Sequence, residues 1–256
     1  MPALIADMPL HLASLLILFA RIGAVWMLLP MFGEDSVPGP VRLLMALGMS
    51  LALLGLLGPR VTPFAAQDSA LVATILVELG IGLAIGSLIR IIMQAASMAG
   101  AIISMQIGFS SALLFDPAVG GQTPVLARLI ALAATLVCFA AGLHHQWIAA
   151  IVRSYDCFPV GTVPSPQDWA ALAIATVGTA TSLAVSLAAP FIVFGILFNV
   201  ALGLSARLAP ALQIFFIAQP LNLLLGLALL GVTLGTILST FSAAMSAWTA
   251  GGWTHG

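Results

Sequence analysis

The chain has 256 residues, of which 62% are hydrophobic and 6% are charged, and its formal net charge at pH 7 is −1. Soluble domains carry about 25% charged residues, so this composition predicts an integral membrane protein and gives no sign of nucleic-acid binding. All seven basic residues are arginines, which argues against a P-loop nucleotide hydrolase or a Schiff-base enzyme because both need a lysine.

The first third of the chain predicts a helical hairpin. Residues 10–30 form an apolar run of about 20 residues, long enough to cross a bilayer, with Arg21 near its centre and Pro30 at its end. After a polar loop, a second apolar helix is expected over residues 41–57, ending at Gly58-Pro59.

The next apolar runs lead to the middle of the chain. A third helix is expected over residues 70–93, containing Glu78 and ending near Arg90, and a fourth apolar run continues through Gly100. A long fifth helix is then expected over residues 124–151.

The second half is expected to begin after a loop over residues 153–168, because three prolines and Gly161 lie there. A run over residues 169–200 is longer than a simple span, and Pro190 should kink it. A last apolar helix is expected over residues 221–247.

Residues 100–124 interrupt the apolar sequence with glycines, amides and a carboxylate. Irregular backbone at membrane depth is tolerated only where protein or a water-filled cavity satisfies its amide groups. The segment is therefore the first functional candidate. The Met and Phe side chains around it fit a hydrophobic constriction that blocks ions by dewetting, or ordinary core packing; these are Met98, Met105, Phe109 and Phe115.

Three ionisable residues lie in or near apolar helices, namely Arg21, Glu78 and Arg90. An unpaired charge in a membrane helix costs at least about 3 kcal/mol, so each should find a partner or water. A structural ion pair, either of Arg21 with Glu78 or of Glu78 with Arg90 from elsewhere in an assembly, and a proton or ion relay are equally compatible with the sequence. Arg207, near Pro210, is expected to make a structural contact with a helix C-terminus or a neighbouring subunit.

Two pairs of glycines four residues apart, Gly82/Gly86 and Gly231/Gly235, predict close helix packing. Adjacent His144 and His145 point about 100° apart on a helix and cannot chelate one metal together. No catalytic residue, metal site or cofactor is predicted, because the serine-hydrolase and metalloprotease motifs are absent.

The order of several motifs resembles the flagellar biosynthetic protein FliR family. The resemblance covers nearly the whole chain. It rests on Gly33–Pro38, Glu78-x-Gly80-x-Gly82, Gly100, Gln106-x-Gly108, Phe115-Asp116-Pro117, Gln122, His144-His145, Ser154–Pro159, Ala189-Pro190, Asn199, Gly203, Arg207, Pro210 and Gln219-Pro220.

This resemblance implies an all-α, integral membrane, helical-hairpin protein that assembles into a helical export-gate ring and is not an enzyme. Residues 1–160 would be a FliP-like portion and residues 161–256 a FliQ-like hairpin and tail. The implied partners are FliP-like and FliQ-like subunits, larger membrane proteins of the export apparatus, unfolded flagellar substrates in transit and membrane lipid. The implied location is the flagellar basal body in the bacterial inner membrane.

The resemblance also implies that the loop after the Gln-x-Gly motif contributes to a plug that closes the channel. In that interpretation glycines provide its bends, Asp116-Pro117 fixes a turn, and methionine and phenylalanine form the seal. The plug or gate residues would be Met105, Gln106, Gly108, Phe109, Phe115, Asp116, Pro117, Gly120, Gly121 and Gln122.

Two other functions stay open at this point. An injectisome export-gate subunit has overlapping sequence patterns, although the Phe115-Asp116-Pro117 region and the short C-terminal tail favour the flagellar system. A secondary transporter would require an inverted repeat with paired broken helices, and the two unequal parts of this chain do not show one.

Overall fold

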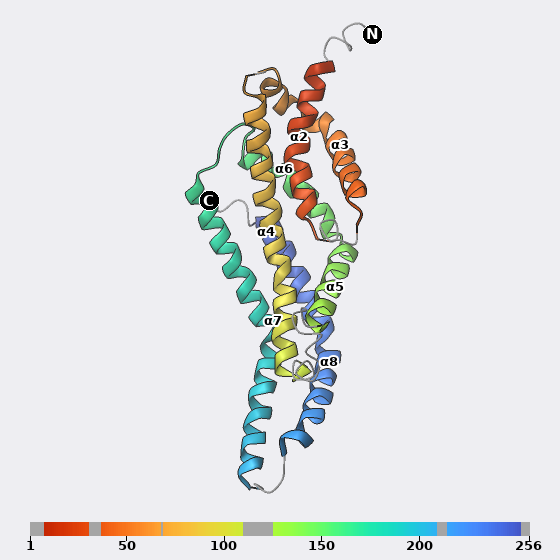
Figure 1. Cartoon of the computed structure of the whole chain (residues 1–256), viewed down its shortest axis with the longest axis vertical. Helices are drawn as coiled ribbons and strands as arrows, with labels where there is room; N and C mark the ends of the chain where they lie inside the picture. Colours follow the sequence, from red (N-terminus) through yellow and green to blue (C-terminus); the bar gives the residue numbers. More distant parts are fainter. Residues whose placement is uncertain (1–7, 31–36, 68, 110–124, 209–213, 252–256) are drawn as a thin grey trace. The chain divides into compact units, whose positions relative to one another are not determined.

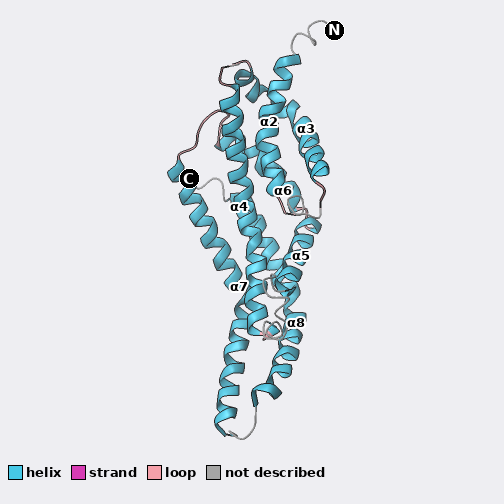
Figure 2. Cartoon of the chain, in the orientation of Figure 1, coloured by secondary structure: helices cyan, strands magenta, loops and turns pink. Residues whose placement is uncertain are grey.

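The computed structural model describes residues 8–30, 37–67, 69–109, 125–208 and 214–251, and for residues 214–217 it describes the backbone alone. Within these ranges the chain is helical and has no strand (Figure 2). The helices, labelled in Figure 1, are α2 (Met8–Leu28), α3 (Gly39–Ala65), α4 (Leu71–Gln106), α5 (Val125–Ala140), α6 (Leu143–Cys157), α7 (Pro166–Leu208) and α8 (Ile214–Gly251).

Five of the described helices are long and apolar enough to cross a membrane, namely α2, α3, α4, α7 and the part of α8 from Ala218 to Gly251. A span of the hydrocarbon region needs about 20 predominantly apolar residues, and each of these helices is at least 21 residues long. The prediction of an all-α integral membrane protein is confirmed.

The helices form two compact units with separate cores. The first contains α2, α3, the start of α4, α6, the start of α7 and the end of α8, and the second contains the rest of α4, α7 and α8 together with α5. The first core includes Ile17, Ile22, Val61, Ile85, Trp147 and Ile151, and the second includes Ile103, Ile107, Ile130, Cys138, Phe191 and Phe241.

One helix, α4, replaces the two apolar runs expected between residues 70 and 106. The expectation that a helix ends near Arg90 is wrong, because a single exposed arginine neither removes a backbone donor nor caps a terminus. Gly100 stays helical at a cost of about 1 kcal/mol relative to alanine. A Cβ there would lie 2.6 Å from the Cα of Ala127, so glycine lets α4 and α5 approach closely.

Helix α3 continues to Ala65, past the Gly58-Pro59 pair where it was expected to end. Pro59 and Pro63 each remove one backbone donor, but Leu57, Val61 and Ala65 are buried in the core of the first unit. Burial of this face favours continuation of the helix in spite of the prolines.

The long helix expected over residues 124–151 is interrupted at Gly142. Its φ of 74° lies in the left-handed region that glycine adopts without a steric penalty, so α5 ends at Ala140 and α6 begins at Leu143. The following loop is also shorter than expected, because α6 extends to Cys157 and α7 begins at Pro166.

The last two helices are longer than expected. Pro190 lies inside the 43-residue α7, and Pro220 lies inside the 38-residue α8. α8 therefore begins before Pro220, although a proline was expected to precede its first residue.

The first glycine pair lies where α4 packs beside α2. A Cβ on Gly82 would meet the carbonyl oxygen of Arg21 and lie 2.8 Å from the Cβ of Ala24, and one on Gly86 would lie 2.8 Å from the Cβ of Leu28. Gly86, one turn after Gly82 on α4, faces residues one turn later on α2, so the two helices run parallel. By contrast, Gly231 and Gly235 are exposed, and a Cβ on either meets no described atom within 4 Å.

We expect Gly82→Ala to lower stability by about 1–3 kcal/mol, because its methyl group would collide with the α2 backbone. The matched control is Gly80→Ala in the same helix, where a Cβ meets nothing within 4 Å and helix propensity favours alanine by up to about 1 kcal/mol. The thermal aggregation midpoint in detergent-solubilised membranes distinguishes the two variants. Equal midpoints would contradict the tight α2–α4 contact.

Candidate functional site

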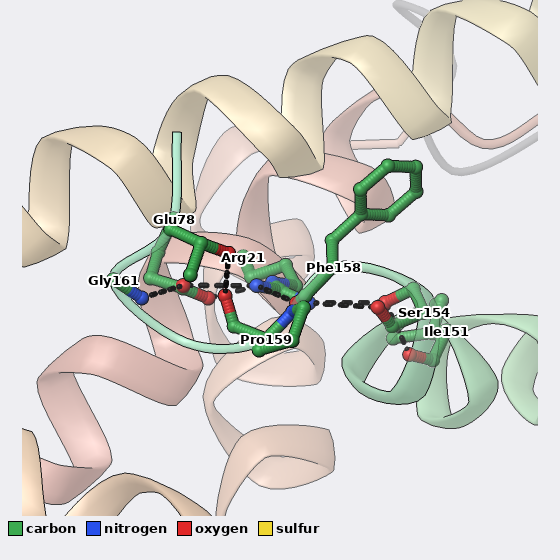
Figure 3. Close-up of polar contacts among 8 residues, drawn as sticks. Arg21, Glu78, Ile151, Ser154, Phe158, Pro159 and Gly161 are labelled. Carbon is green, nitrogen blue, oxygen red and sulfur yellow. Dashed lines mark hydrogen bonds and ion pairs between the residues drawn. The ribbon is translucent and has the colours of Figure 1, made fainter. Parts of the chain in front are cut away.

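The most deeply buried polar cluster is centred on Arg21 of α2 and Glu78 of α4 (Figure 3). Arg21 Nε donates to Glu78 Oε2 at 2.6 Å and Arg21 Nη2 donates to Oε1 at 2.9 Å. Both side chains are fully buried. The pair is bidentate, the geometry in which arginine–carboxylate interactions are strong.

The remaining arginine donors are directed to the end of α6. Arg21 Nη1 donates to Ser154 O at 3.2 Å and to Ser154 Oγ at 3.4 Å, and Nη2 also donates to Phe158 O at 2.9 Å. A guanidinium has five N–H donors, and these five contacts match that number. The carbonyl oxygens lie at the C-terminus of α6, where positive charge is favoured by the helix dipole.

The cluster also fixes the loop at residues 158–165. Gly161 N donates to Glu78 Oε1 at 3.3 Å, while the φ of Gly161 is 74° and a Cβ there would lie 3.1 Å from the Phe64 ring. The ring of Phe158 stacks on that of Trp169, at a centroid distance of 4.9 Å. The loop is therefore held by α3, α4 and α7 as well as by Arg21.

The Tyr155 ring completes the enclosure of the guanidinium, with Arg21 Cζ 4.0 Å from the ring centroid. This cation–π contact adds attraction in a desolvated site. Since both oxygens of Glu78 and all five donors of Arg21 are engaged, the geometry favours a fixed structural pair over a relay, which needs a group free to exchange protons with a neighbour.

The other two predicted charged residues lie outside this cluster. Arg90 is exposed on α4, and Arg207 is exposed in the last turn of α7, where its charge complements the helix dipole. Neither forms an ion pair with another described residue. Among the described side chains, no three His, Cys, Asp or Glu residues lie close enough together to hold a metal ion.

Four of the ten predicted plug residues are described: Met105 and Gln106 end α4, and Gly108 and Phe109 follow it. Met105 is 70% exposed, Gln106 is the last helical residue, and Gly108 has a φ of 76° that turns the chain before Phe109. The other six residues lie outside the described ranges, namely Phe115, Asp116, Pro117, Gly120, Gly121 and Gln122.

The end of α4 packs against α7 and α8 at positions that the sequence analysis did not select. A Cβ on Gly195 of α7 would meet the side-chain amide of Gln106, and a Cβ on Gly226 of α8 would lie 2.5 Å from Ile107 Cβ. Asn222 Nδ2 donates to Gln106 O at 3.5 Å. Asn222 could have been noticed as the amide that follows Gln219-Pro220 in an apolar run, but the glycines carry no distinguishing signal.

Glu78→Gln should lower stability by about 3–5 kcal/mol, because it leaves a buried guanidinium without a countercharge. The double variant Arg21→Met/Glu78→Met should recover part of that loss. Asp156→Asn is the control, since it breaks the Arg60–Asp156 pair, which is also 2.6 Å long but has side chains 47% and 61% exposed.

The exposed control should change stability by at most about 1 kcal/mol. Thermal unfolding midpoints in detergent, measured for all three variants, make the comparison. A Glu78→Gln midpoint as high as that of Asp156→Asn would show that the buried pair does not stabilise the first unit.

Nearly the whole chain is similar to known proteins. Residues 12–248 match the family described as "Bacterial export proteins, family 1". The flagellar biosynthetic protein FliR of Caulobacter vibrioides is 42% identical over 221 residues, which cover 86% of this chain and 88% of the relative. FliR of Escherichia coli is 32% identical over 218 residues, with 85% and 82% covered.

A relative from another secretion system also matches. The Yop proteins translocation protein T of Yersinia pestis is 28% identical over 232 residues, which cover 90% of this chain and 88% of the relative. The resemblance inferred from the motifs is confirmed, and the protein belongs to the FliR family of bacterial export proteins, as a membrane component of flagellar type III export.

Proposed function

We propose that the chain is a non-enzymatic subunit of the flagellar type III export gate in the bacterial inner membrane, within the basal body. The match to FliR proteins along residues 12–248 carries this proposal. Two observations support a location in the bacterial inner membrane: the FliR relatives are bacterial proteins, and five of the described helices are long and apolar enough to cross a membrane. The absence of lysine and of hydrolase motifs in the sequence supports a role without catalysis.

FliP-like and FliQ-like subunits are the partners we propose, with residues 1–160 as the FliP-like portion and residues 161–256 as the FliQ-like hairpin and tail. The surface of the described helices supports a partner. Few residues in the most apolar 18-residue stretches of α3 and α8 are buried inside the chain, namely 17% in α3 and 22% in α8. Gly231 and Gly235 offer α8 backbone to a neighbouring helix, since small residues permit close approach.

We also propose that residues 105–122 contribute the plug that closes the channel. The exposed Met105 supports this proposal because a thioether side chain is flexible and adapts to irregular surfaces. The left-handed conformation of Gly108 turns the chain away from the helical path of α4 within this segment. A seal of such side chains would exclude water and ions by dewetting and yield to an unfolded substrate.

An injectisome export-gate subunit is the second candidate. The 28% identity to the Yop proteins translocation protein T over most of both chains supports it. The 42% identity to FliR of Caulobacter vibrioides favours the flagellar gate. Complementation of a motility defect, compared with that of an effector-secretion defect, separates the two systems.

Production of the chain without FliP-like and FliQ-like partners should yield aggregated or degraded protein, because its apolar faces and exposed glycines would remain uncovered. Co-production with both partners should raise the yield of monodisperse protein at least tenfold. Size-exclusion chromatography in detergent measures this yield. A stable, monodisperse chain obtained alone would contradict the proposed assembly.

Deletion of residues 109–115 should leave the assembled complex intact and increase ion leakage, because a dewetted constriction would be lost. Leakage is measured as ion flux through proteoliposomes that contain equal amounts of purified complex. Arg60→Ala serves as a control, since it alters one exposed ion pair of the first unit. Unchanged leakage through a fully assembled deletion complex would return these residues to ordinary packing.

A further inference from the structure

The C-terminal end of α4 is held between two helices of the second unit by unusually close contacts. Figure 1 shows this end of α4 between α7 and α8, and the geometry around Gly195 and Gly226 places both helices against it. A methyl group on Gly195 would meet the flexible amide of Gln106. One on Gly226 would meet the branched Cβ of Ile107, which has little freedom to move.

Asn222 adds a directional contact to this packing. Its side chain is 7% exposed in an apolar helix, and its Nδ2 donates to the carbonyl oxygen of Gln106. The last four carbonyl oxygens of a helix lack partners within that helix, so Asn222 supplies a donor where α4 needs one. The contact joins residues that are 116 positions apart in the sequence.

The last turn of α4 and the residue after it have one buried and one exposed face. Ile103 and Ile107 are four residues apart and fully buried, whereas Met105 between them is 70% exposed. Residues two apart on a helix point roughly 200° apart. A rotation of the last turn of α4 would therefore exchange a buried isoleucine for the exposed methionine.

We propose that Asn222, together with Gly195 and Gly226, forms an anchor that sets the rotation and position of the C-terminus of α4, and hence the point at which the plug begins. This inference rests on the proposed plug function. Asn222 acts through α4 and is a positioning residue. The Oδ1 atom of Asn222 is buried without a hydrogen-bond partner among the described residues. Such a group lowers the stability of the fold, so stability alone does not account for an asparagine at this position.

Asn222→Leu separates positioning from stability. Leucine has a similar volume and removes the unsatisfied Oδ1, so complex yield should stay within about twofold of wild type, since loss of a half-satisfied buried group is close to neutral. The rotational restraint on α4 is lost. Thr233→Val in the same helix is the control, because the Thr233 hydroxyl donates to Leu229 O of α8 itself.

The position of α4 is measured by the distance between spin labels on Phe109→Cys and Val193→Cys in the assembled complex. Both residues belong to the second unit, and Val193 is an exposed residue of α7. The exposed Cys157 is replaced by serine, and the buried Cys138 is kept. We expect a narrow distance distribution in the parent and in Thr233→Val, and one at least twice as broad in Asn222→Leu.

Ion leakage through the same complexes, without labels, gives the functional result. Asn222→Leu should increase leakage several-fold, as should the independent variant Gly226→Ala, while Gly178→Ala in α7 serves as its control because a Cβ there meets no described atom. A distance distribution in Asn222→Leu as narrow as in the parent would overturn the anchor.

Failure of the anchor differs from failure of the plug. If deletion of residues 109–115 causes leakage and a broadened Asn222→Leu complex does not, the anchor does not position the plug and the inference is overturned. If the deletion itself causes no leakage, the proposed plug is wrong, and a broadened distribution still supports Asn222 as the anchor of α4.

Discussion

Burial of the Arg21 guanidinium constrains the whole first unit. A charge with no access to water needs a countercharge and a partner for each donor, and Glu78 alone can satisfy only part of that need. The carboxylate must come from a helix lying against α2, and the remaining acceptors come from the end of α6. Three segments far apart in sequence are thereby brought to one side chain.

The position of Gly82 is linked to the same ion pair. Glu78 and Gly82 lie one turn apart on α4, so the carboxylate that binds the Arg21 side chain is adjacent to the glycine that faces the Arg21 backbone. Close approach of α2 and α4 shortens the ion pair, and the ion pair holds the two helices in register. A lysine in place of Arg21 could not supply the five donors in this planar arrangement.

The length of α4 limits how much of its apolar surface lipid can cover. At 1.5 Å per residue, the 36 residues of α4 extend about 54 Å, whereas the hydrocarbon region is about 30 Å thick. Even at a tilt of about 40°, the upper end of the usual range, α4 would cover roughly 41 Å along the membrane normal. Part of this apolar helix therefore extends beyond the hydrocarbon region, where protein partners are the natural cover for it.

Composition and the lengths of the apolar runs were sufficient to predict a helical membrane protein, and the motif order was sufficient to predict the family. Helix boundaries were less predictable, because the same residue type acts differently in different surroundings. Gly142 adopts a left-handed conformation and interrupts the chain, while Gly100 remains helical against α5. Pro59 lies inside a helix because the flanking Leu57 and Val61 are buried.

The charged cluster was only partly predictable from sequence. Arg21 and Glu78 were identified because charges are rare in apolar helices, but the sequence left Arg90 as an equal partner for Glu78. The acceptors on Ser154 and Phe158 are mostly backbone carbonyls, which every residue has. Asn222 was missed for a similar reason, since its role depends on a contact with Gln106 on another helix.

Imaging of single particles of the chain purified with its FliP-like and FliQ-like partners tests the central claim most directly. The account predicts that this chain forms part of a helical ring around a closed channel, with residues 105–122 at the constriction. A purified ring that closes without this chain, or a map in which residues 105–122 lie away from the channel, would contradict it.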